Sequence, residues 1–108
     1  DLSSLLKAAD IFCYPSKYPE GLPTVLLEAA VQETGIITSD CAGAREVVPD
    51  QDYGIVLDGT EPHVIAQAIV NMSNNISYLD TCKKNVKTHV SEHFSWSSTA
   101  KKIESLLD

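Results

Sequence analysis

The chain has 108 residues, 44% of them hydrophobic, which predicts one small globular domain and argues against disorder. Its net charge of −7 argues against nucleic acid as a partner, because phosphate binding needs clustered Lys and Arg. No apolar run reaches the roughly 18–20 residues of a membrane span, so membrane contact is not indicated. We expect a cytoplasmic protein, because no signal peptide opens the chain and an odd number of cysteines, three, fits a reducing compartment. The spacing of these cysteines matches no metal site. Cys13 and Cys41 lie in apolar surroundings and are expected to be buried thiols.

The opening of the chain predicts a helix, a strand and a loop. Leucines recur at helical spacing in residues 1–9. Residues 11–14 are a short apolar run with β-branched and aromatic side chains, which predicts a buried strand that Pro15 ends. Residues 16–22 are rich in Pro, Gly, Ser and Tyr, which indicates a loop.

The next elements alternate between helix and strand. Pro23 suits the first position of a helix, because it lacks the backbone N–H that would be unpaired there. Residues 24–33 are almost wholly apolar, which predicts a helix buried on most sides. A second buried strand is predicted at residues 35–38, and a short helix at residues 44–48.

The second half of the chain predicts one strand and three helices. The strand is expected at residues 53–57, followed by a helix over residues 61–72 that Thr60 can cap. Another helix is expected over residues 76–90 with an exposed basic face, and Ser95 can cap the last helix.

This alternation of short strands with helices predicts an α/β fold, a Rossmann-like parallel sheet with helices on both faces. Three strands are few for a doubly wound domain, which has about five or six. We therefore expect residues 1–108 to be a partial, C-terminal part of a larger Rossmann-like domain.

A ligand is expected near the loop that follows the first strand, because open α/β sheets bind ligands beyond the carboxyl ends of their strands. A helix N-terminus favours anions, so the backbone amides of Leu22, Thr24 and Val25 are candidates for contacting a phosphate. Gly21 would let such a ligand approach the backbone closely.

Two glutamates eight positions apart, Glu20 and Glu28, are the candidate polar contacts. A carboxylate inside an apolar helix is costly unless it is hydrogen-bonded, and the two hydroxyls of a ribose would suit Glu28. An equally weighted interpretation is that Glu28 pairs with a Lys or Arg, or points to solvent. Glu20 could accept bonds from a second polyol, although taken alone it is more typical of a surface loop.

An ordered set of short segments resembles the C-terminal half of the GT-B-fold retaining glycosyltransferases, in the glycosyl transferases group 1 family. The resemblance extends from about residue 5 to residue 107. The segments that carry it are Ala9–Phe12, Pro15–Ser16, Glu20–Pro23, Leu27–Ala29, Thr38–Asp40, Gly43, Glu46–Val48, Gly54–Leu57 and Phe94–Trp96.

The resemblance implies a domain that binds a nucleoside-diphosphate sugar for retaining transfer to an unknown acceptor, with polysaccharide biosynthesis among the roles of the family. It implies that Glu28 holds the ribose, that Glu20 is the catalytic residue and contacts the donor sugar, and that Ser16 lies at the pocket rim. The implied donor-binding residues are Ser16, Glu20, Gly21, Leu22, Pro23, Thr24, Val25 and Glu28. No metal or other cofactor is expected, because amides and basic side chains would stabilise the leaving diphosphate.

The chain also departs from the family. Glu33 and Gly35 stand where the family usually has Gly and then Pro, so a different turn is expected there. The basic pair and the acceptor-binding N-terminal Rossmann domain of the family have no counterpart in the chain, and Arg45, its only arginine, is not in the matching place. We therefore expect the parent protein to be the enzyme and the fragment to be inactive alone. The alternatives are a nucleotide-sugar epimerase of the same architecture and a non-catalytic α/β interaction module.

Overall fold

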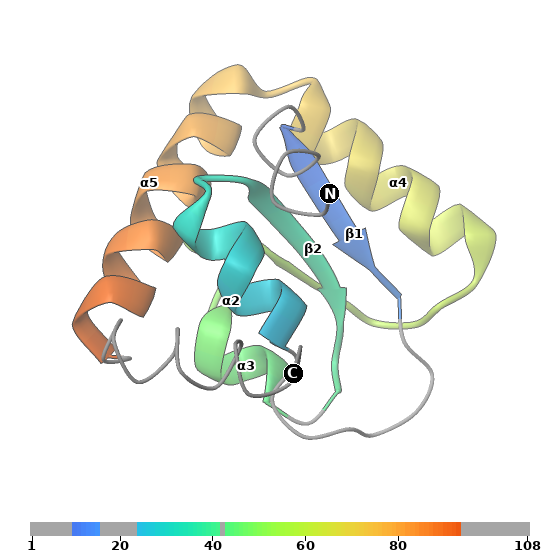
Figure 1. Ribbon diagram of the computed structural model, residues 1–108. Helices are drawn as coiled ribbons and strands as arrows, with labels where there is room; N and C mark the ends of the chain where they lie inside the picture. The colour runs from blue at the N-terminus through green and yellow to red at the C-terminus, as the bar shows by residue number, and fades with distance from the viewer. Residues whose placement is uncertain (1–9, 16–23, 42, 94–108) are drawn as a thin grey trace.

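A computed structural model describes residues 10–15, 24–41 and 43–93 of the chain (Figure 1). Its elements in chain order are β1 (Ile11–Tyr14), α2 (Thr24–Val31), β2 (Gly35–Ser39), α3 (Ala44–Val47), β3 (Ile55–Leu57), α4 (Pro62–Ser73) and α5 (Ile76–His93). The helices predicted for residues 1–9 and after Ser95 lie outside the described residues. The predicted alternation of strand and helix is confirmed for the described part.

The three strands form one parallel sheet in the order β1-β2-β3. Ile11 lies opposite Gly35 in the first pair of strands, and Ile37 lies opposite Ile55 in the second. Parallel neighbours need a crossover connection, and α2 and α3 provide the two crossovers. The predicted Rossmann-like α/β fold is therefore confirmed.

Helices cover both faces of this sheet, as predicted (Figure 1). Adjacent residues of β2 point to opposite faces: Ile36 packs with α2, α3 and the end of α5, and Ile37 packs with α4 and the start of α5. Both side chains are fully buried. The long helix α5 thus contributes to both cores, through Val86 and Val90 on one side and Leu79 and Cys82 on the other.

The first strand is less buried than predicted. All four residues of β1 are only partly buried, whereas all five of β2 are buried. The difference follows from position, because β2 has a strand on each side and β1 has one described neighbour. The prediction of buried thiols is accordingly wrong for Cys13 and Cys41, which are half-buried, and Cys82 on α5 is the buried one. Burial raises the thiol pKa of both Cys13 and Cys82.

The starts of two predicted elements move in the structure. The third strand begins at Ile55 rather than residue 53, because a turn precedes it in which the Tyr53 N–H donates to the Asp50 carbonyl at 3.1 Å. Helix α4 begins at Pro62 with Glu61 as its N-cap residue, so Thr60 is not the cap. Pro62 has no N–H to be capped, which removes one of the donors that a side-chain cap would satisfy.

The turn before β2 begins at the end of α2. Glu33 adopts a left-handed backbone with φ 54°, the conformation that glycine takes most easily. Its N–H donates to the Ala30 carbonyl at 3.1 Å, and the Thr34 N–H donates to the Ala29 carbonyl at 3.1 Å. These two bonds form a Schellman motif, so α2 ends in a glycine-type turn with a glutamate in the left-handed position.

Side chains of helix α5 contact the residues that precede each of the three strands. The Lys83 ammonium lies 3.5 Å from the Asp10 carboxylate before β1, and the Lys87 ammonium lies 3.6 Å from the Glu33 carboxylate before β2. Before β3, three side chains of α5 donate to backbone carbonyls. They are Tyr78 to Gln51 at 2.7 Å, Cys82 to Gln51 at 3.7 Å and Asn85 to Asp52 at 2.9 Å. The predicted exposed basic face is therefore confirmed for Lys84 and Lys87, whereas Lys83 is half-buried beside Asp10.

Candidate functional site

The carboxyl ends of the three strands meet at one edge of the sheet, where the fold class predicts a ligand. Tyr14 ends β1, Ser39 ends β2, and Leu57, which lies opposite Ser39, ends β3. The Ser39 hydroxyl donates to the Tyr14 carbonyl at 3.4 Å, which connects the ends of the first two strands. We call this side of the sheet, with the loops that leave it, the carboxyl edge.

Three of the predicted site residues, Thr24, Val25 and Glu28, lie on described helix α2. The other predicted site residues lie outside the described residues, and their roles stay predictions. They are Ser16, Glu20, Gly21, Leu22 and Pro23. The described part of helix α2 begins at Thr24, and the loop predicted before it lies outside the described residues.

The side of α2 that packs on the sheet is apolar and wholly buried. Leu26, Leu27, Ala29 and Ala30 are at most 2% exposed, which confirms the prediction of a helix buried on most sides. Thr24, Val25 and Glu28 are partly buried on the same helix. Since Thr24 and Glu28 are four residues apart, they lie on one face, one turn above the other.

The Glu28 carboxylate has no ion pair or hydrogen bond with any described residue. Three described cations are already paired with other acids: Lys83 with Asp10, Lys87 with Glu33, and Arg45 with Asp40. The interpretation in which Glu28 pairs with a basic side chain is therefore not supported within residues 10–15, 24–41 and 43–93. A half-buried carboxylate on an apolar helix remains available to a hydroxylated ligand.

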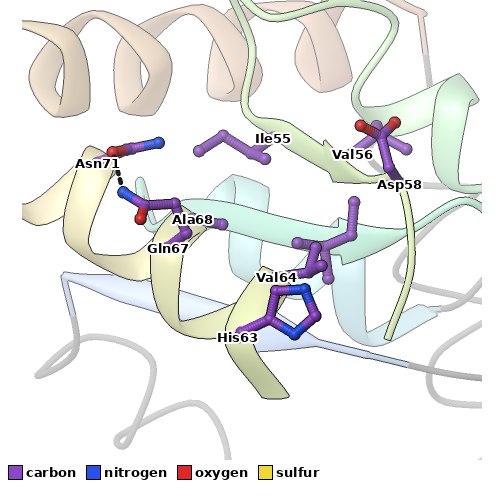
Figure 2. Close-up of a pocket in the computed structure, with 9 residues that line it drawn as sticks. Ile55, Val56, Asp58, His63, Val64, Gln67, Ala68 and Asn71 are labelled. Carbon is purple, nitrogen blue, oxygen red and sulfur yellow. Dashed lines mark hydrogen bonds between the residues drawn. The ribbon is translucent and has the colours of Figure 1, made fainter. Parts of the chain in front are cut away.

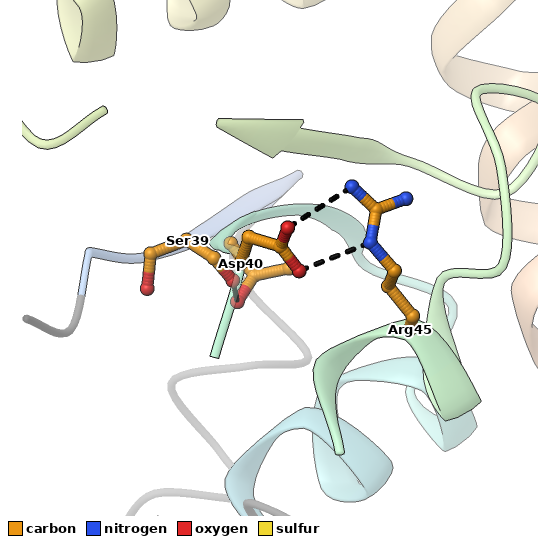
Figure 3. Close-up of polar contacts among 4 residues, drawn as sticks. Ser39, Asp40 and Arg45 are labelled. Atoms are coloured by element: carbon orange, nitrogen blue, oxygen red, sulfur yellow. Dashed lines mark hydrogen bonds and ion pairs between the residues drawn. The ribbon is translucent and has the colours of Figure 1, made fainter. Parts of the chain in front are cut away.

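An arginine and an aspartate form a two-point contact at the loop after β2 (Figure 3). The Arg45 Nε donates to Asp40 Oδ1 at 3.0 Å, and its second terminal nitrogen donates to Asp40 Oδ2 at 3.2 Å. These hydrogen bonds raise the pKa of Arg45, so its guanidinium stays charged. Both side chains are more than half exposed, so the pair contributes little to stability.

The structure pairs Arg45 with Asp40 rather than with its sequence neighbour Glu46. The two residues are five positions apart across a loop, and this spacing alone does not predict a contact. The carboxyl edge thus carries one fixed cation that no motif indicated.

Two further properties of the described residues bear on the chemistry. None of their helices is long and apolar enough to cross a membrane. They contain no group of three or more His, Cys, Asp or Glu side chains placed to hold a metal ion.

The fold matches the C-terminal domain of GT-B glycosyltransferases. Sucrose-phosphate synthase from Thermosynechococcus elongatus superposes with a TM-score of 0.82 at 25% identity, over 98% of this chain and 26% of that one. The Anabaena protein HepE, solved in complex with UDP-glucose, superposes with a TM-score of 0.83 at 22% identity, over 98% of this chain and 29% of that one.

The sequence matches the same class. Residues 1–89 match the family "Glycosyl transferases group 1". An uncharacterized glycosyltransferase of Methanocaldococcus jannaschii is 30% identical over 105 residues, which cover 97% of this chain and 27% of that protein. The chain therefore belongs to the glycosyl transferases group 1 family of retaining GT-B enzymes, which confirms the predicted resemblance. It spans about a quarter of the length of the relatives it matches.

Proposed function

We propose that the chain is the donor-binding part of a retaining glycosyltransferase and holds a nucleoside-diphosphate sugar at its carboxyl edge. The observation that carries this proposal is Glu28, a half-buried carboxylate without a partner among the described residues, on the helix that starts at that edge. Family membership supports the same conclusion.

The two hydroxyls of a ribose satisfy such a carboxylate well. Each can donate one hydrogen bond to one oxygen of Glu28, and a hydrogen bond to a charged group contributes roughly 1.5–3 kcal/mol. Binding also stabilises the carboxylate, because hydrogen-bond donors of the ligand replace water at a half-buried position. A ribose at Glu28 would place the attached diphosphate toward the start of α2, where the helix dipole favours negative charge.

The remaining roles follow from the resemblance. Glu20 is proposed to contact hydroxyls of the donor sugar as the catalytic residue, and Ser16 to lie at the pocket rim. The amides of Gly21, Leu22, Thr24 and Val25 are proposed to face the diphosphate, with Pro23 setting the start of the helix. Preorganised amides stabilise the charge that develops on the departing phosphate, and no metal is required in this proposal.

The acceptor site belongs, in this proposal, to a second Rossmann domain outside this chain. Residues 1–108 would then be the partial donor half and inactive alone, and the whole protein would transfer the sugar. HepE was solved with UDP-glucose, which makes UDP the first nucleotide to test. The proposal also includes a cytoplasmic location, where nucleotide sugars are the donors. It further includes a role in polysaccharide biosynthesis.

The test measures binding of UDP, GDP and ADP to the protein by isothermal titration calorimetry, with Glu28→Gln beside the natural protein. Glutamine keeps the shape and removes the charge, so two weakened hydrogen bonds should lower the affinity about tenfold or more. Glu92→Gln is the matched control, because Glu92 is exposed near the end of α5 and the change in charge is the same.

Equal affinities of the natural protein and Glu28→Gln would overturn the assignment of Glu28. Product analysis with a sugar nucleotide separates the remaining alternatives. Release of nucleoside diphosphate together with a glycosylated acceptor supports a transferase, and an epimerised sugar nucleotide supports an epimerase. A non-catalytic interaction module predicts that no nucleotide binds.

A further inference from the structure

Two histidines lie one turn apart near the end of α5. His89 and His93 are four residues apart on this helix, and their ring centres are 4.5 Å apart with the ring planes tilted by 43°. His89 is half-buried and His93 is exposed. Two histidines at this spacing project from one helical face, which is the arrangement that zinc-binding helices use. The pair therefore has the spacing of a metal chelate.

Contacts with two other elements hold the His89 ring. Its Nε2 lies 2.8 Å from the backbone carbonyl of Glu46 in α3. The ring of Tyr53, in the turn before β3, lies 5.1 Å from the His89 ring, centre to centre. A carbonyl only accepts hydrogen bonds, so neutral His89 carries its hydrogen on Nε2 and keeps a lone pair on Nδ1. Metal-binding histidines are held in the same way, with one nitrogen donating to a carbonyl and the other bound to the metal.

The distance between the two rings suits one shared metal ion. A metal about 2.0–2.1 Å from one nitrogen of each ring would lie about 3.2 Å from each ring centre. Ring centres 4.5 Å apart then correspond to an N–metal–N angle of about 90°. Neighbouring ligands make this angle in square-planar and octahedral sites, whereas the angle of a tetrahedral zinc site is wider. The separation therefore favours Ni²⁺ or Cu²⁺ over Zn²⁺.

We propose that His89 and His93 bind one Ni²⁺ or Cu²⁺ ion through two ring nitrogens, and that water fills its other coordination positions. The described residues contain no group of three or more His, Cys, Asp or Glu side chains placed to hold a metal ion, so the site is a pair. The ion would connect the end of α5 to α3 through the contact between His89 and Glu46. Because Tyr53 precedes β3, the pair lies away from the carboxyl edge, and this proposal is independent of the donor site.

Isothermal titration calorimetry with Ni²⁺ tests the proposal on the protein made without a histidine tag. One Ni²⁺ per chain is expected to bind. His93→Gln should weaken this binding by about tenfold or more, because one imidazole lacks the second, intramolecular contact with the ion. The variant should keep its fold, since His93 is exposed. An excess of Mg²⁺, which prefers oxygen ligands, should not displace the Ni²⁺.

His63→Gln is the matched control. Figure 2 shows His63 on α4, beside a hollow of about 420 Å³ in which no other lining residue is a histidine or a cysteine. His63 is exposed like His93, so both variants remove one exposed imidazole. Only His93→Gln breaks the pair, and the nickel affinity of His63→Gln should therefore equal that of the natural protein.

Nuclear magnetic resonance identifies the nitrogen that holds the ion. Zn²⁺ is the diamagnetic probe, because imidazole nitrogens also bind zinc. Proton–nitrogen correlation spectra of the histidine rings should show the ion on Nδ1 of His89 and the hydrogen retained on Nε2.

Four results would overturn the proposal. One is the absence of Ni²⁺ binding by the natural protein. Another is an equal nickel affinity of His93→Gln and His63→Gln. The third is displacement of Ni²⁺ by Mg²⁺, which would indicate general attraction of cations to a chain with a net charge of −7. The fourth is zinc bound to Nε2 of His89, because the contact with Glu46 would then have to break.

Discussion

The two edges of the sheet are built differently. At the amino edge, side chains of α5 hold the residues that precede every strand, through Lys83, Lys87, Tyr78, Cys82 and Asn85. At the carboxyl edge, the side-chain contacts described above join residues of that edge to one another: Ser39 to the Tyr14 carbonyl, and Arg45 to Asp40. One edge is fixed by a helix from the far end of the chain, and the other is where we propose that the donor binds. In this proposal, stability and binding are assigned to opposite ends of the same three strands.

The largest effect on stability should come from adding a methyl group at the amino edge. The same addition at the carboxyl edge is its control. At Gly54, before β3, a Cβ would lie 2.7 Å from the Ile36 carbonyl oxygen and 3.2 Å from a Val48 methyl group. Neither can move easily, so Gly54→Ala should lower the free energy of unfolding by about 1–3 kcal/mol. At Gly59, after β3, a Cβ would meet only the flexible end of Glu61.

Gly59→Ala is therefore the matched control and should change the free energy of unfolding by less than about 0.5 kcal/mol. Urea unfolding followed by circular dichroism measures both variants. Equal losses at the two positions would contradict the contrast between the edges.

Removing one hydroxyl tests the contact between α5 and the turn before β3. Tyr78→Phe deletes the donor to the Gln51 carbonyl and should cost about 1 kcal/mol at neutral pH. Burial, followed by the contact with Cys82, raises the pKa of Tyr78 above its usual 10.0. A raised pKa means that the folded state holds the proton more tightly, so this stability is present below about pH 10 and falls as the pH rises further.

Unfolding of the natural protein and Tyr78→Phe from pH 7 to pH 11 checks this prediction. The natural protein should lose more stability above pH 10 than the variant does. A constant difference between the two across this range would show that the Tyr78 proton is not linked to folding.

Replacing the left-handed glutamate should stabilise the amino edge. Glu33→Gly relieves a φ of 54° that costs a residue with a Cβ roughly 1–2 kcal/mol, and the exposed ion pair with Lys87 that it removes contributes little. After the extra unfolded-state entropy of glycine, a gain of about 0.5–1 kcal/mol is expected in thermal or urea unfolding. Glu33→Ala removes the same ion pair without relieving the backbone and should not stabilise.

The smallest effect on stability is expected at the carboxyl edge itself. Glu28→Gln should change the free energy of unfolding by less than about 0.5 kcal/mol, because the carboxylate has no partner among the described residues. Urea unfolding without nucleotide measures it. A loss above about 1 kcal/mol would mean that the Glu28 carboxylate stabilises the fold. A lower nucleotide affinity of the variant would then count only if the variant is shown to be folded.

Much of the fold could be predicted because its signals are local. Apolar runs located β1 and β2, and the positions of Pro23 and Pro62 are consistent with helices that begin at Thr24 and Pro62. The start of β3 was placed two residues early, because the turn at Asp50 to Tyr53 is set by hydrogen bonds and not by hydrophobicity. The left-handed Glu33 could not be predicted either, since helix termination there depends on how β2 enters the sheet.

The candidate site was predicted in part. The placement of Glu28 on a largely buried helix next to the carboxyl edge follows from the pattern of apolar residues around it. The absence of an ion pair between Glu28 and a described basic residue could not be predicted. It depends on which acidic residues Lys83, Lys87 and Arg45 contact in the folded protein. The roles of Glu20 and the loop before α2 stay predictions.

The sequence alone determined the alternation of strand and helix, the parallel sheet and the family, because periodicity, prolines and ordered motifs are properties of neighbouring residues. Only the tertiary structure decided that α5 contacts the residues before all three strands and that Arg45 is engaged by Asp40. These features join residues from 5 to 73 positions apart. Contacts at such separations depend on how whole elements pack, which no local pattern encodes.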